Sequence, residues 1–386
     1  MAMVTSPALP HAPKQALDDP YPYFAWLREH EPVHREHRRR EVWSVSRYDD
    51  VRALLTDPRL SKRPELVPGY TAGPEGLNNH LVHADPPAHT RLRGLVNTAF
   101  VPRRVAALEP LITRTARTLV DRFGPRPDLV TDFALPLTFT VICTILGVSA
   151  SHNTPKVRSL LAASVTPDAP SQDGELREFL NVLVAEKRAA PGAEDDLLAA
   201  LVHANQGGDW LTDDELVSTA YLLLLVGHDT TVGLIGNGML ALLRHPDQAH
   251  RLRHDPALMP TAVEELLRYD SPVRDATFRV AIEDIPLHSH VIPAGAIVCL
   301  LIGSANRDER KFANADVLNL GRQPNDHIAF GRGAHFCVGA ALSRLEGSLA
   351  IGTLLRHLPD LRLAGPPTWR PSRVMRSLEH LPVVRR

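Results

Sequence analysis

The sequence predicts a mainly helical α+β fold, in which one large domain carries a small β region. Apolar residues recur at helical spacing through most of residues 87–269. Short segments with strand-like alternation, bounded by Gly and Pro, are found mainly in residues 276–303 and 365–386. No internal repeat or low-complexity segment divides the chain, so we expect a single domain over residues 1–386, with a flexible N-terminal segment at 1–17.

The part before residue 205 is predicted to be helical, apart from one strand and one long loop. Pro102 interrupts the helical spacing, because proline lacks the backbone N–H that a helix interior uses. Residues 149–175 contain Ser, Asn, Pro, Asp and Gly, which is typical of loops. We expect helices at 20–30, 48–55, 87–123 with the break at Pro102, 131–148, 175–189 and 194–204, and a strand at 40–46.

The clearest helix is predicted over residues 213–243. Thr212 and Glu215 match a capping box, in which each side chain accepts a hydrogen bond from the other residue's backbone N–H. Pro246 ends the helical pattern. At about 1.5 Å per residue, the helix is on the order of 45 Å long, enough to cross the molecule. Its glycines are costly in a helix interior, which indicates a close approach to the helix backbone.

The C-terminal part is predicted to combine two helices with short strands. Residues 276–303 hold strand-like segments and a Pro-Ala-Gly turn. The Pro-rich tail at 365–386 is predicted to form a strand pair. The two helices are expected at 260–269 and 337–357.

Composition and charge exclude several classes of protein. The formal net charge is −1, without the basic excess that nucleic-acid binding requires. The most apolar stretches, 133–148 and 220–226, are too short to span a bilayer, so no membrane anchor is expected. Cys143, Cys299 and Cys337 are far apart and odd in number, which argues against a disulfide framework or a structural zinc site. A reducing, cytoplasmic setting fits this pattern best.

Residues 330–339, Phe-Gly-Arg-Gly-Ala-His-Phe-Cys-Val-Gly, are the strongest candidate for a functional site. Two glycines permit a tight turn and a close approach to a flat ligand. Cys337 is predicted to open the helix that follows, and the free N–H groups of a helix N-terminus favour thiolate over thiol. A thiolate held in this way can ligate haem iron. From the residues alone, the alternative is a buried structural cysteine beside a Gly-rich turn.

The spacing F-G-x-G-x-H-x-C-x-G resembles the haem-binding loop of the cytochrome P450 family, and the resemblance covers the chain from about residue 18 to its C-terminus. It implies the helical prism of that family, with a small β region. It also implies haem b between the long helix and the helix after Cys337, with Cys337 as the iron ligand. Phe330 and Gly339 of the loop would contact the haem.

A second segment of the resemblance is Val-Gly-His-Asp-Thr-Thr at 226–231, midway along the long helix. The resemblance implies that Thr230 hydrogen-bonds the reacting oxygen and that Asp229 feeds it protons from solvent. Gly227 would leave room for dioxygen. Val226 departs from the family pattern, which has a smaller residue there, and indicates a tighter pocket wall. The alternative is an ordinary polar helix segment with local hydrogen bonds.

Four basic residues match the family's propionate-binding positions. His89 and Arg93 are spaced i, i+4 on one face of a helix that follows a Pro-Pro pair. Haem carries two anionic propionates, which need cations when partly buried. The resemblance places His89, Arg93, Arg279 and His335 beside them, although each one taken singly is better explained as a solvated basic residue. Arg91 lies off the His89/Arg93 face and is expected to point outward.

Glu265 and Arg268 form an E-x-x-R pair that shares one helix face. An arbitrary pair with this spacing is usually a surface ion pair. In the family that the chain resembles, the pair is buried and supports the haem-binding core, so we expect a structural role. Glu264 remains open as an alternative partner of Arg268.

The resemblance implies a monooxygenase that inserts one atom of O2 into a mid-sized, fairly apolar organic substrate, in the tailoring of secondary metabolites. The chain has no room for a reductase domain, so electrons are expected from a separate ferredoxin-type protein, and a monomer is expected. The predicted docking patch comprises Arg91, Arg103, Arg104, Arg332 and Arg344. Substrate contacts are expected from residues 62–84, 155–185, 222–230, 273–278 and 370–377.

Two other functions remain open from the sequence. A peroxygenase of the same fold would use peroxide without a redox partner and would not need Asp229 and Thr230. A haem protein that only binds or senses a ligand would also share the fold. The presence of the acid–alcohol pair counts against both.

Overall fold

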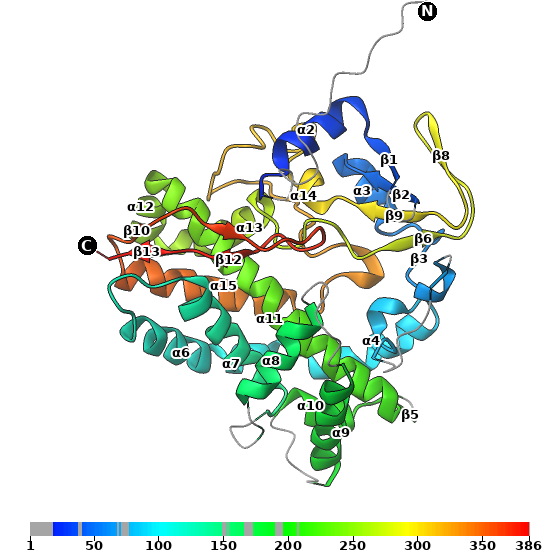
Figure 1. The fold of residues 1–386 in the computed structure, drawn as a ribbon, viewed down its shortest axis with the longest axis horizontal. Helices are drawn as coiled ribbons and strands as arrows, with labels where there is room; N and C mark the ends of the chain where they lie inside the picture. Colours follow the sequence, from blue (N-terminus) through cyan, green and yellow to red (C-terminus); the bar gives the residue numbers. More distant parts are fainter. Residues whose placement is uncertain are drawn as a thin grey trace, which may run out of the picture.

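The computed structural model has a large helical part and a smaller β-rich part, and the long helix α11 (Asp213–Arg244) runs through the middle of the molecule (Figure 1). It describes residues 18–37, 41–67, 69–70, 77–148, 152, 154–165, 173–189, 196–206 and 208–385. The expected flexible segment 1–17 lies outside the described residues. The predicted mainly helical α+β class is confirmed.

The helices agree with most of the sequence-based expectations. Pro102 separates two helices, as its missing N–H predicts. The predicted helix at 131–148 is a π-helical turn that continues into an α-helix. The helices besides α11 are α2 (Tyr21–His30), α3 (Tyr48–Leu54), α4 (Ala88–Ala99), α5 (Pro102–Ala107), α6 (Glu109–Asp121), η3 (Val130–Ala134), α7 (Leu135–Ile145), α8 (Thr154–Val165), α9 (Asp173–Ala189), α10 (Leu197–Val202), α12 (Pro246–His254), α13 (Met259–Tyr269), α14 (Ile302–Ala305) and α15 (Ala340–His357), with short turns η1 (Pro64–Leu66), η2 (Leu81–His83), η5 (Pro256–Leu258) and η6 (Gly333–His335).

Helix α11 is the central element of the main hydrophobic core. The predicted capping box is confirmed, because Thr212 accepts from the Glu215 backbone N–H at 3.3 Å and Glu215 accepts from the Thr212 N–H at 2.9 Å. The helix packs against α7, α13 and α15, and residues 231–242 in its second half are all buried. The glycines do permit a close approach: a Cβ at Gly233 would lie only 2.9 Å from Cβ of Pro272. Among the described helices, only α11 is long and apolar enough to cross a membrane, but 61% of its apolar window is buried in the fold, as in a core helix.

A five-stranded sheet forms most of the β-rich part, in the order β1-β2-β9-β6-β3. β2 and β9 pair in parallel, and the other neighbours are antiparallel. Val45, Val298 and Leu300 are fully buried, in a second hydrophobic cluster shared with α3 and α14. The sheet strands are β1 (Val33–His37), β2 (Glu41–Val45), β3 (Leu60–Ser61), β6 (Arg279–Ala281) and β9 (Ile297–Leu300). The two-stranded pairs are β4 (Asn205–Gln206) with β5 (Asp209–Trp210), β7 (Ile285–Leu287) with β8 (His290–Ile292), β10 (Arg362–Leu363) with β13 (Val383–Val384), and β11 (Thr368–Trp369) with β12 (Leu378–His380).

The predicted loop at 149–175 is wrong in part, because it contains helix α8 and the start of α9. Val157, Leu160 and Leu161 are buried and have the spacing of one helix face. Because Ser, Pro and Asp surround this short apolar pattern, the composition of the segment predicts a loop. Helix α12 and strand β1 are also absent from the sequence-based expectations.

The start of the helix after the cysteine also differs from the prediction. Helix α15 begins at Ala340 with Gly339 as its N-cap residue, so Cys337 lies in the turn before the helix. The carbonyl of Cys337 still accepts from the Ala340 N–H, at 3.4 Å. The cysteine is therefore adjacent to the helix N-terminus without being part of the helix.

Candidate active site

A cavity of about 260 Å³ lies between α11, the loop 330–339 and the segment before β6. Its wall is mainly apolar, with contributions that include Leu81, Val82, Ile142, Leu222, Val226, Val273, Ala276 and Ile302. Its polar residues include Arg93, Thr230, Thr231, Thr277, Arg279, His335, Cys337 and Ser343. Val226 is 43% exposed although it lies midway along α11, because its side chain forms part of this wall.

The cysteine loop reaches the cavity through two backbone turns. Gly331 and Gly333 have φ of +71° and +73°, in the left-handed region that favours glycine. A Cβ at Gly333 would also lie 2.6 Å from a methyl group of Thr56. The Cys337 N–H donates to the Phe330 carbonyl at 2.9 Å, which closes the loop and places the sulfur in the cavity wall. The two glycines thus permit the tight turn before Cys337, as the sequence predicts.

Cys337 is exposed at the cavity wall, although protein atoms on the other sides partly desolvate its thiol. This desolvation raises the pKa of the Cys337 thiol, whereas a backbone hydrogen bond from Gly339 and the nearby Arg93 and Arg344 act to lower it. In the protein alone the net shift of this pKa is upward, against the sequence-based expectation, because desolvation outweighs the hydrogen bond from Gly339 at the start of α15. A bound metal cation deprotonates a coordinating thiol outright, so this shift does not prevent ligation.

The acid and the alcohol of α11 face different surroundings. Thr230 lines the cavity and its Oγ1 donates to the Val226 carbonyl at 3.0 Å. The Asp229 carboxylate accepts from Arg370 at 2.6 Å, and in the described structure Asp229 is not part of the cavity wall. Gly227 also lines the cavity, but a Cβ on it would lie 2.8 Å from Cδ1 of Ile142 on α7. Packing against α7 therefore gives a second reason for glycine at position 227, besides the room for dioxygen that the sequence predicts.

The four basic residues predicted to bind propionates come together at one side of the cavity. The rings of His89 and His335 lie 4.2 Å apart between centroids. Arg93 donates to the Phe336 carbonyl at 2.7 Å, and Arg279 donates to the Thr277 carbonyl at 3.0 Å. In the described part of the chain, neither arginine is bonded to a carboxylate.

The electrostatics of these four groups indicate an anionic ligand. Burial lowers the pKa of Arg279 to about 10, and burial together with neighbouring cations lowers the pKa of His335 to about 3. Nε2 of His89 is buried and has no hydrogen-bond partner among the described residues. A buried ring nitrogen without a partner and a group of desolvated cations are costly, and an anion that binds there would relieve the cost of the cations. These residues therefore fit the two carboxylates of a haem.

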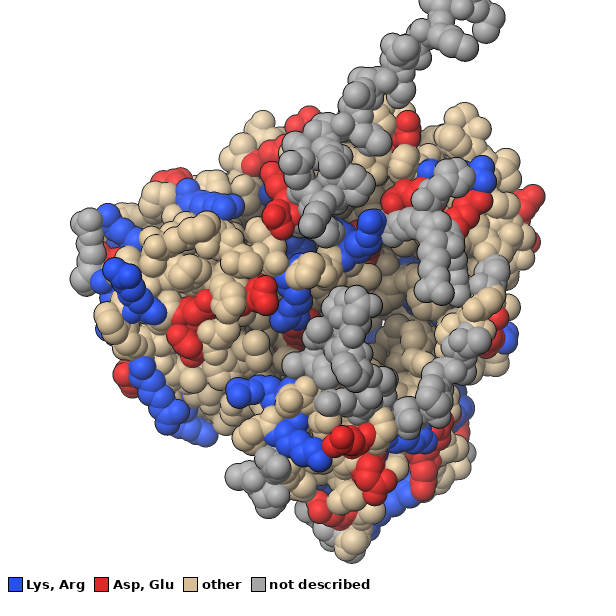
Figure 2. Space-filling view, viewed as in Figure 1, with Lys and Arg blue, Asp and Glu red and all other residues tan. Residues whose placement is uncertain are grey.

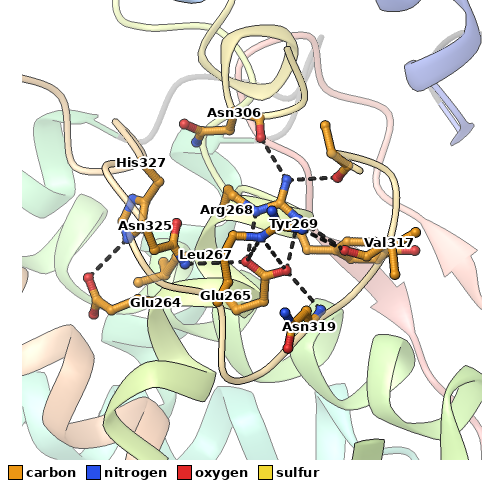
Figure 3. A network of polar contacts seen from close by, with 12 residues as sticks. Glu264, Glu265, Leu267, Arg268, Tyr269, Asn306, Val317, Asn319, Asn325 and His327 are labelled. Carbon is orange, nitrogen blue, oxygen red and sulfur yellow. Dashed lines mark hydrogen bonds and ion pairs between the residues drawn. The ribbon is translucent and has the colours of Figure 1, made fainter. Parts of the chain in front are cut away.

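Glu265 and Arg268 form a buried ion pair beside the loop that carries Val317, Asn319 and Asn325 (Figure 3). Both side chains are 0% exposed, and Arg268 donates from Nε at 2.7 Å and from Nη2 at 2.9 Å. Nη1 of Arg268 also donates to the carbonyls of Asn306 and Ala315. The pair therefore ties α13 to the segment that leads into the cysteine loop.

Glu264, the alternative partner of Arg268, is engaged elsewhere. Its carboxylate accepts two hydrogen bonds from Arg344, at 2.6 and 2.8 Å, and contacts Nε2 of His327 at 3.0 Å. The two adjacent glutamates thus have separate partners, which sequence spacing could not decide.

Residues 171–359 match the family described as Cytochrome P450. The chain is 42% identical over 381 residues to the cytochrome P450 monooxygenase PikC of Streptomyces venezuelae, a match that covers 95% of this chain and 91% of PikC. The chain belongs to the cytochrome P450 family. Like its relatives named monooxygenases, this P450 is an oxidoreductase, and the family uses haem, an organic substrate, O2 and a redox partner.

Solved P450 structures have the same fold. The P450 PksS of the bacillaene polyketide synthase of Bacillus subtilis 168 has a TM-score of 0.91 at 37% identity, covering 96% of this chain and 98% of PksS. The P450 monooxygenase TamI, solved with tirandamycin C bound, has a TM-score of 0.88 at 38% identity, covering 97% of this chain and 99% of TamI. The predicted helical prism with a small β region is therefore confirmed.

The arginines of the predicted docking patch differ in their surroundings, and the patch itself stays a prediction. Arg91 is bonded to Asp209 at 3.1 Å and to the Glu215 carboxylate at the start of α11, so it does not point freely outward. Arg344 is held by Glu264. Arg103 and Arg332 are exposed. The face of the molecule in Figure 2 carries both signs of charge in a scattered pattern.

The cavity of this P450 uses some of the segments predicted to contact substrate. Segments 62–84, 222–230 and 273–278 all contribute to the wall. In the described parts of 155–185 and 370–377, no residue lines it. Lys62, which lies directly behind the wall, falls within the predicted segment 62–84, but its role was not predicted because the partners of its side chain are more than 200 residues away.

Proposed function

We propose that this P450 binds haem b through Cys337 and inserts one oxygen atom from O2 into a mid-sized, mainly apolar organic substrate. The observation that carries the proposal is the convergence of Cys337, Arg93, Arg279 and His335 on one cavity beneath α11. A thiol alone, or the basic residues alone, would have simpler explanations. Together they match the two groups of a haem that a protein binds most strongly, its iron and its propionates.

Each cofactor contact follows from the geometry of the described residues. Cys337 would supply the iron ligand, with Phe330 and Gly339 of the same loop beside it in the wall. The propionates would be held by the group His89, Arg93, Arg279 and His335. Haem with a thiolate ligand supplies the reductive activation of O2 and favours O–O cleavage. The Glu265–Arg268 pair would keep the cysteine loop in place without touching the cofactor.

Proton delivery is assigned to Asp229 and Thr230. Thr230 presents its hydroxyl at the cavity wall, and Asp229 lies on the adjacent position outside that wall. A carboxylate that exchanges protons with solvent and a hydroxyl beside the reacting oxygen form a general acid relay. A peroxide-driven enzyme would not need this relay, which is why we favour the O2-dependent reaction.

The substrate is inferred from the wall and from the relatives. Aliphatic side chains dominate the wall, and Val226 narrows it where α11 passes. PksS is named for a polyketide synthase, and TamI was solved with tirandamycin C. We therefore propose a role in secondary metabolism, on a substrate of similar size and apolar character.

The redox partner is inferred to be a separate ferredoxin-type protein. Arg332 and Phe336 of the cysteine loop are both exposed where the loop borders the cavity. A cationic group so near the iron ligand would suit a small acidic electron carrier. We propose that the enzyme acts as a cytoplasmic monomer.

The test is the absorption spectrum of the dithionite-reduced protein with carbon monoxide. We expect the red-shifted Soret band of a haem-thiolate protein, and its loss in Cys337→Ser with haem retained. Turnover should then require NADPH, a reductase and a ferredoxin, and should not be supported by peroxide alone. A protein that binds no haem would overturn the proposal, and turnover with peroxide alone would favour the peroxygenase.

A further inference from the structure

Lys62, directly after β3, is a lysine buried in the wall behind the cavity. It is 2% exposed, whereas lysine is among the residues least often buried. Its Nζ donates to three oxygens of two adjacent residues: the Thr277 carbonyl at 3.2 Å, Thr277 Oγ1 at 2.5 Å and the Phe278 carbonyl at 2.7 Å. None of these acceptors is a carboxylate. The nearby Asp85 instead accepts from Ser61 and from the Lys62 backbone N–H.

The segment that Lys62 holds is part of the cavity wall. Thr277 lines the cavity and its side chain is exposed to it. Arg279 lines the same cavity and donates to the same Thr277 carbonyl, at 3.0 Å. Two cations therefore share the Thr277 carbonyl. Lys62 also fixes the Thr277 hydroxyl.

An ammonium group has hydrogens to donate but no lone pair with which to accept. The Thr277 hydroxyl must therefore accept from Lys62, and its own hydrogen has to point elsewhere. Among the described residues, Thr277 Oγ1 has no acceptor for that hydrogen, and the cavity lies on its open side. Burial and Arg279 lower the pKa of Lys62, whereas the nearby Asp85 and Cys299 raise it. Two of the three oxygens around Nζ belong to carbonyls, which can only accept, and this arrangement suits an ammonium group.

The neighbouring threonines of the cavity wall are arranged differently. Thr230 donates its hydroxyl hydrogen to the Val226 carbonyl, and Thr231 donates to Ser343. Both hydrogens are thus used within the protein. Thr277 differs from them because a donor-only partner occupies its oxygen.

We propose that Thr277, oriented by Lys62, donates a hydrogen bond to an acceptor oxygen of the substrate, such as a ketone, lactone or ether oxygen. Lys62 is then a positioning residue and Thr277 a specificity-determining one. This inference rests on the proposed function, since it takes the part of the cavity that the haem would leave free to be the substrate site, with Thr277 facing that part. It adds a chemical requirement, because an otherwise apolar substrate would need an acceptor oxygen at this side of the cavity.

The experiment compares cyclooctanone with cyclooctane, a ring with and without one acceptor oxygen. Both are titrated into the haem-loaded protein by calorimetry in sealed cells, and the readout is the ratio of the cyclooctane Kd to the cyclooctanone Kd. We expect Thr277→Val to lower this ratio roughly fivefold, the range of one neutral hydrogen bond. Lys62→Met should lower it similarly, and the double variant no further, because both act on one hydrogen bond.

Matched variants separate positioning from general stability. Thr277→Ser retains a hydroxyl and should retain the wild-type ratio, and Lys311→Met, at a more exposed lysine bonded to Asp326, should not change it. An unchanged ratio in Thr277→Val would overturn the proposal. A Lys62→Met protein that binds both ligands more weakly by the same factor would show that Lys62 only supports the fold.

The ligand ratio and the proposed function can fail separately. Calorimetry reports binding whether or not the iron has a thiolate ligand, so a missing red-shifted Soret band would overturn the cofactor assignment and leave the ratio measurable. Failure of the wild-type protein to bind either ring would overturn the cavity as a substrate site, and with it the role of Thr277.

Discussion

Arg370 holds the Asp229 carboxylate from outside the cavity. Its Nη1 lies 2.6 Å from Asp229 Oδ1, which joins the C-terminal hairpin β11–β12 to the middle of α11. Thr230, the next residue, faces the cavity instead. A proton that passes from Asp229 to Thr230 must therefore be carried by water or by a rotation of Asp229 away from Arg370. The following predictions start from this relationship.

Asp229→Asn should slow turnover without weakening substrate binding. The amide keeps the size of the side chain and an oxygen acceptor for Arg370, but it cannot carry a proton. We expect kcat to fall by about two orders of magnitude, in the range of general acid catalysis, with the substrate Kd unchanged. The measurements are ferredoxin-supported turnover and a spin-state titration. Asp247→Asn, at an exposed residue, is the matched control, and a wild-type kcat in Asp229→Asn would exclude the relay.

Glu265→Gln should destabilise the fold strongly. The substitution leaves the Arg268 guanidinium fully buried opposite a neutral amide. Breaking a buried ion pair in this way costs about 3–5 kcal/mol of the free energy of unfolding. Urea unfolding measures it. Glu264→Gln, one residue earlier and partly exposed, should cost less than Glu265→Gln because solvent screens its ion pair, so equal losses would contradict the distinct role of the buried pair.

Glu264 should make stability depend on pH in the acid range. Although burial acts to raise it, the hydrogen bonds from Arg344 and His327 lower the pKa of Glu264 from 4.5 to about 2. As the pH falls below 4.5, the unfolded chain takes up a proton that the folded protein resists until about 2. The stabilisation is therefore present above this window and is lost as the pH falls through it.

The measurement is the difference in free energy of unfolding between the wild type and Glu264→Gln, at about pH 6 and about pH 3. We expect the difference to shrink at the lower pH. Glu379→Gln, at an exposed residue, should show no such change. A difference that is constant with pH would mean that the Arg344 and His327 contacts do not hold the proton off Glu264.

Sequence patterns predict the parts of this fold that depend on neighbouring residues. The start of α11 follows from Thr212 and Glu215, which satisfy each other within one helical turn. The turn before Cys337 follows from Gly331 and Gly333, whose positive φ angles few other residues adopt. In both places the physical cause lies inside the pattern itself.

Partners that are distant in the chain cannot be predicted in this way. Arg91 is placed correctly off the His89/Arg93 face, but its acids, Asp209 and Glu215, are brought to it only by the packing of α11 against the rest of the fold. Lys62 looks like any surface lysine until β3 and β6 pair and place it behind Thr277. The same holds for Arg268, since its spacing on α13 cannot decide whether Glu264 or Glu265 is its partner.

Gly227→Ala separates two explanations for the glycine in α11. A new Cβ would lie 2.8 Å from Ile142 Cδ1, so Ile142 has to move, and Ile142 itself lines the cavity. The clash costs about 1 kcal/mol or more, but alanine regains about 1 kcal/mol of helix propensity. We therefore expect a small change in the free energy of unfolding and a several-fold weaker binding of cavity ligands, measured by calorimetry.

Ile142→Val in the Gly227→Ala background decides between the explanations, because valine lacks the Cδ1 atom that the new Cβ would meet. If helix packing sets the requirement for glycine, the second substitution should restore ligand binding and the coupled turnover of oxygen. If glycine is needed for the room it leaves above the cofactor, the Cβ still occupies that room, and the double variant should remain as impaired as Gly227→Ala alone. Ile142→Val by itself is the control, since it enlarges the cavity without adding an atom to α11.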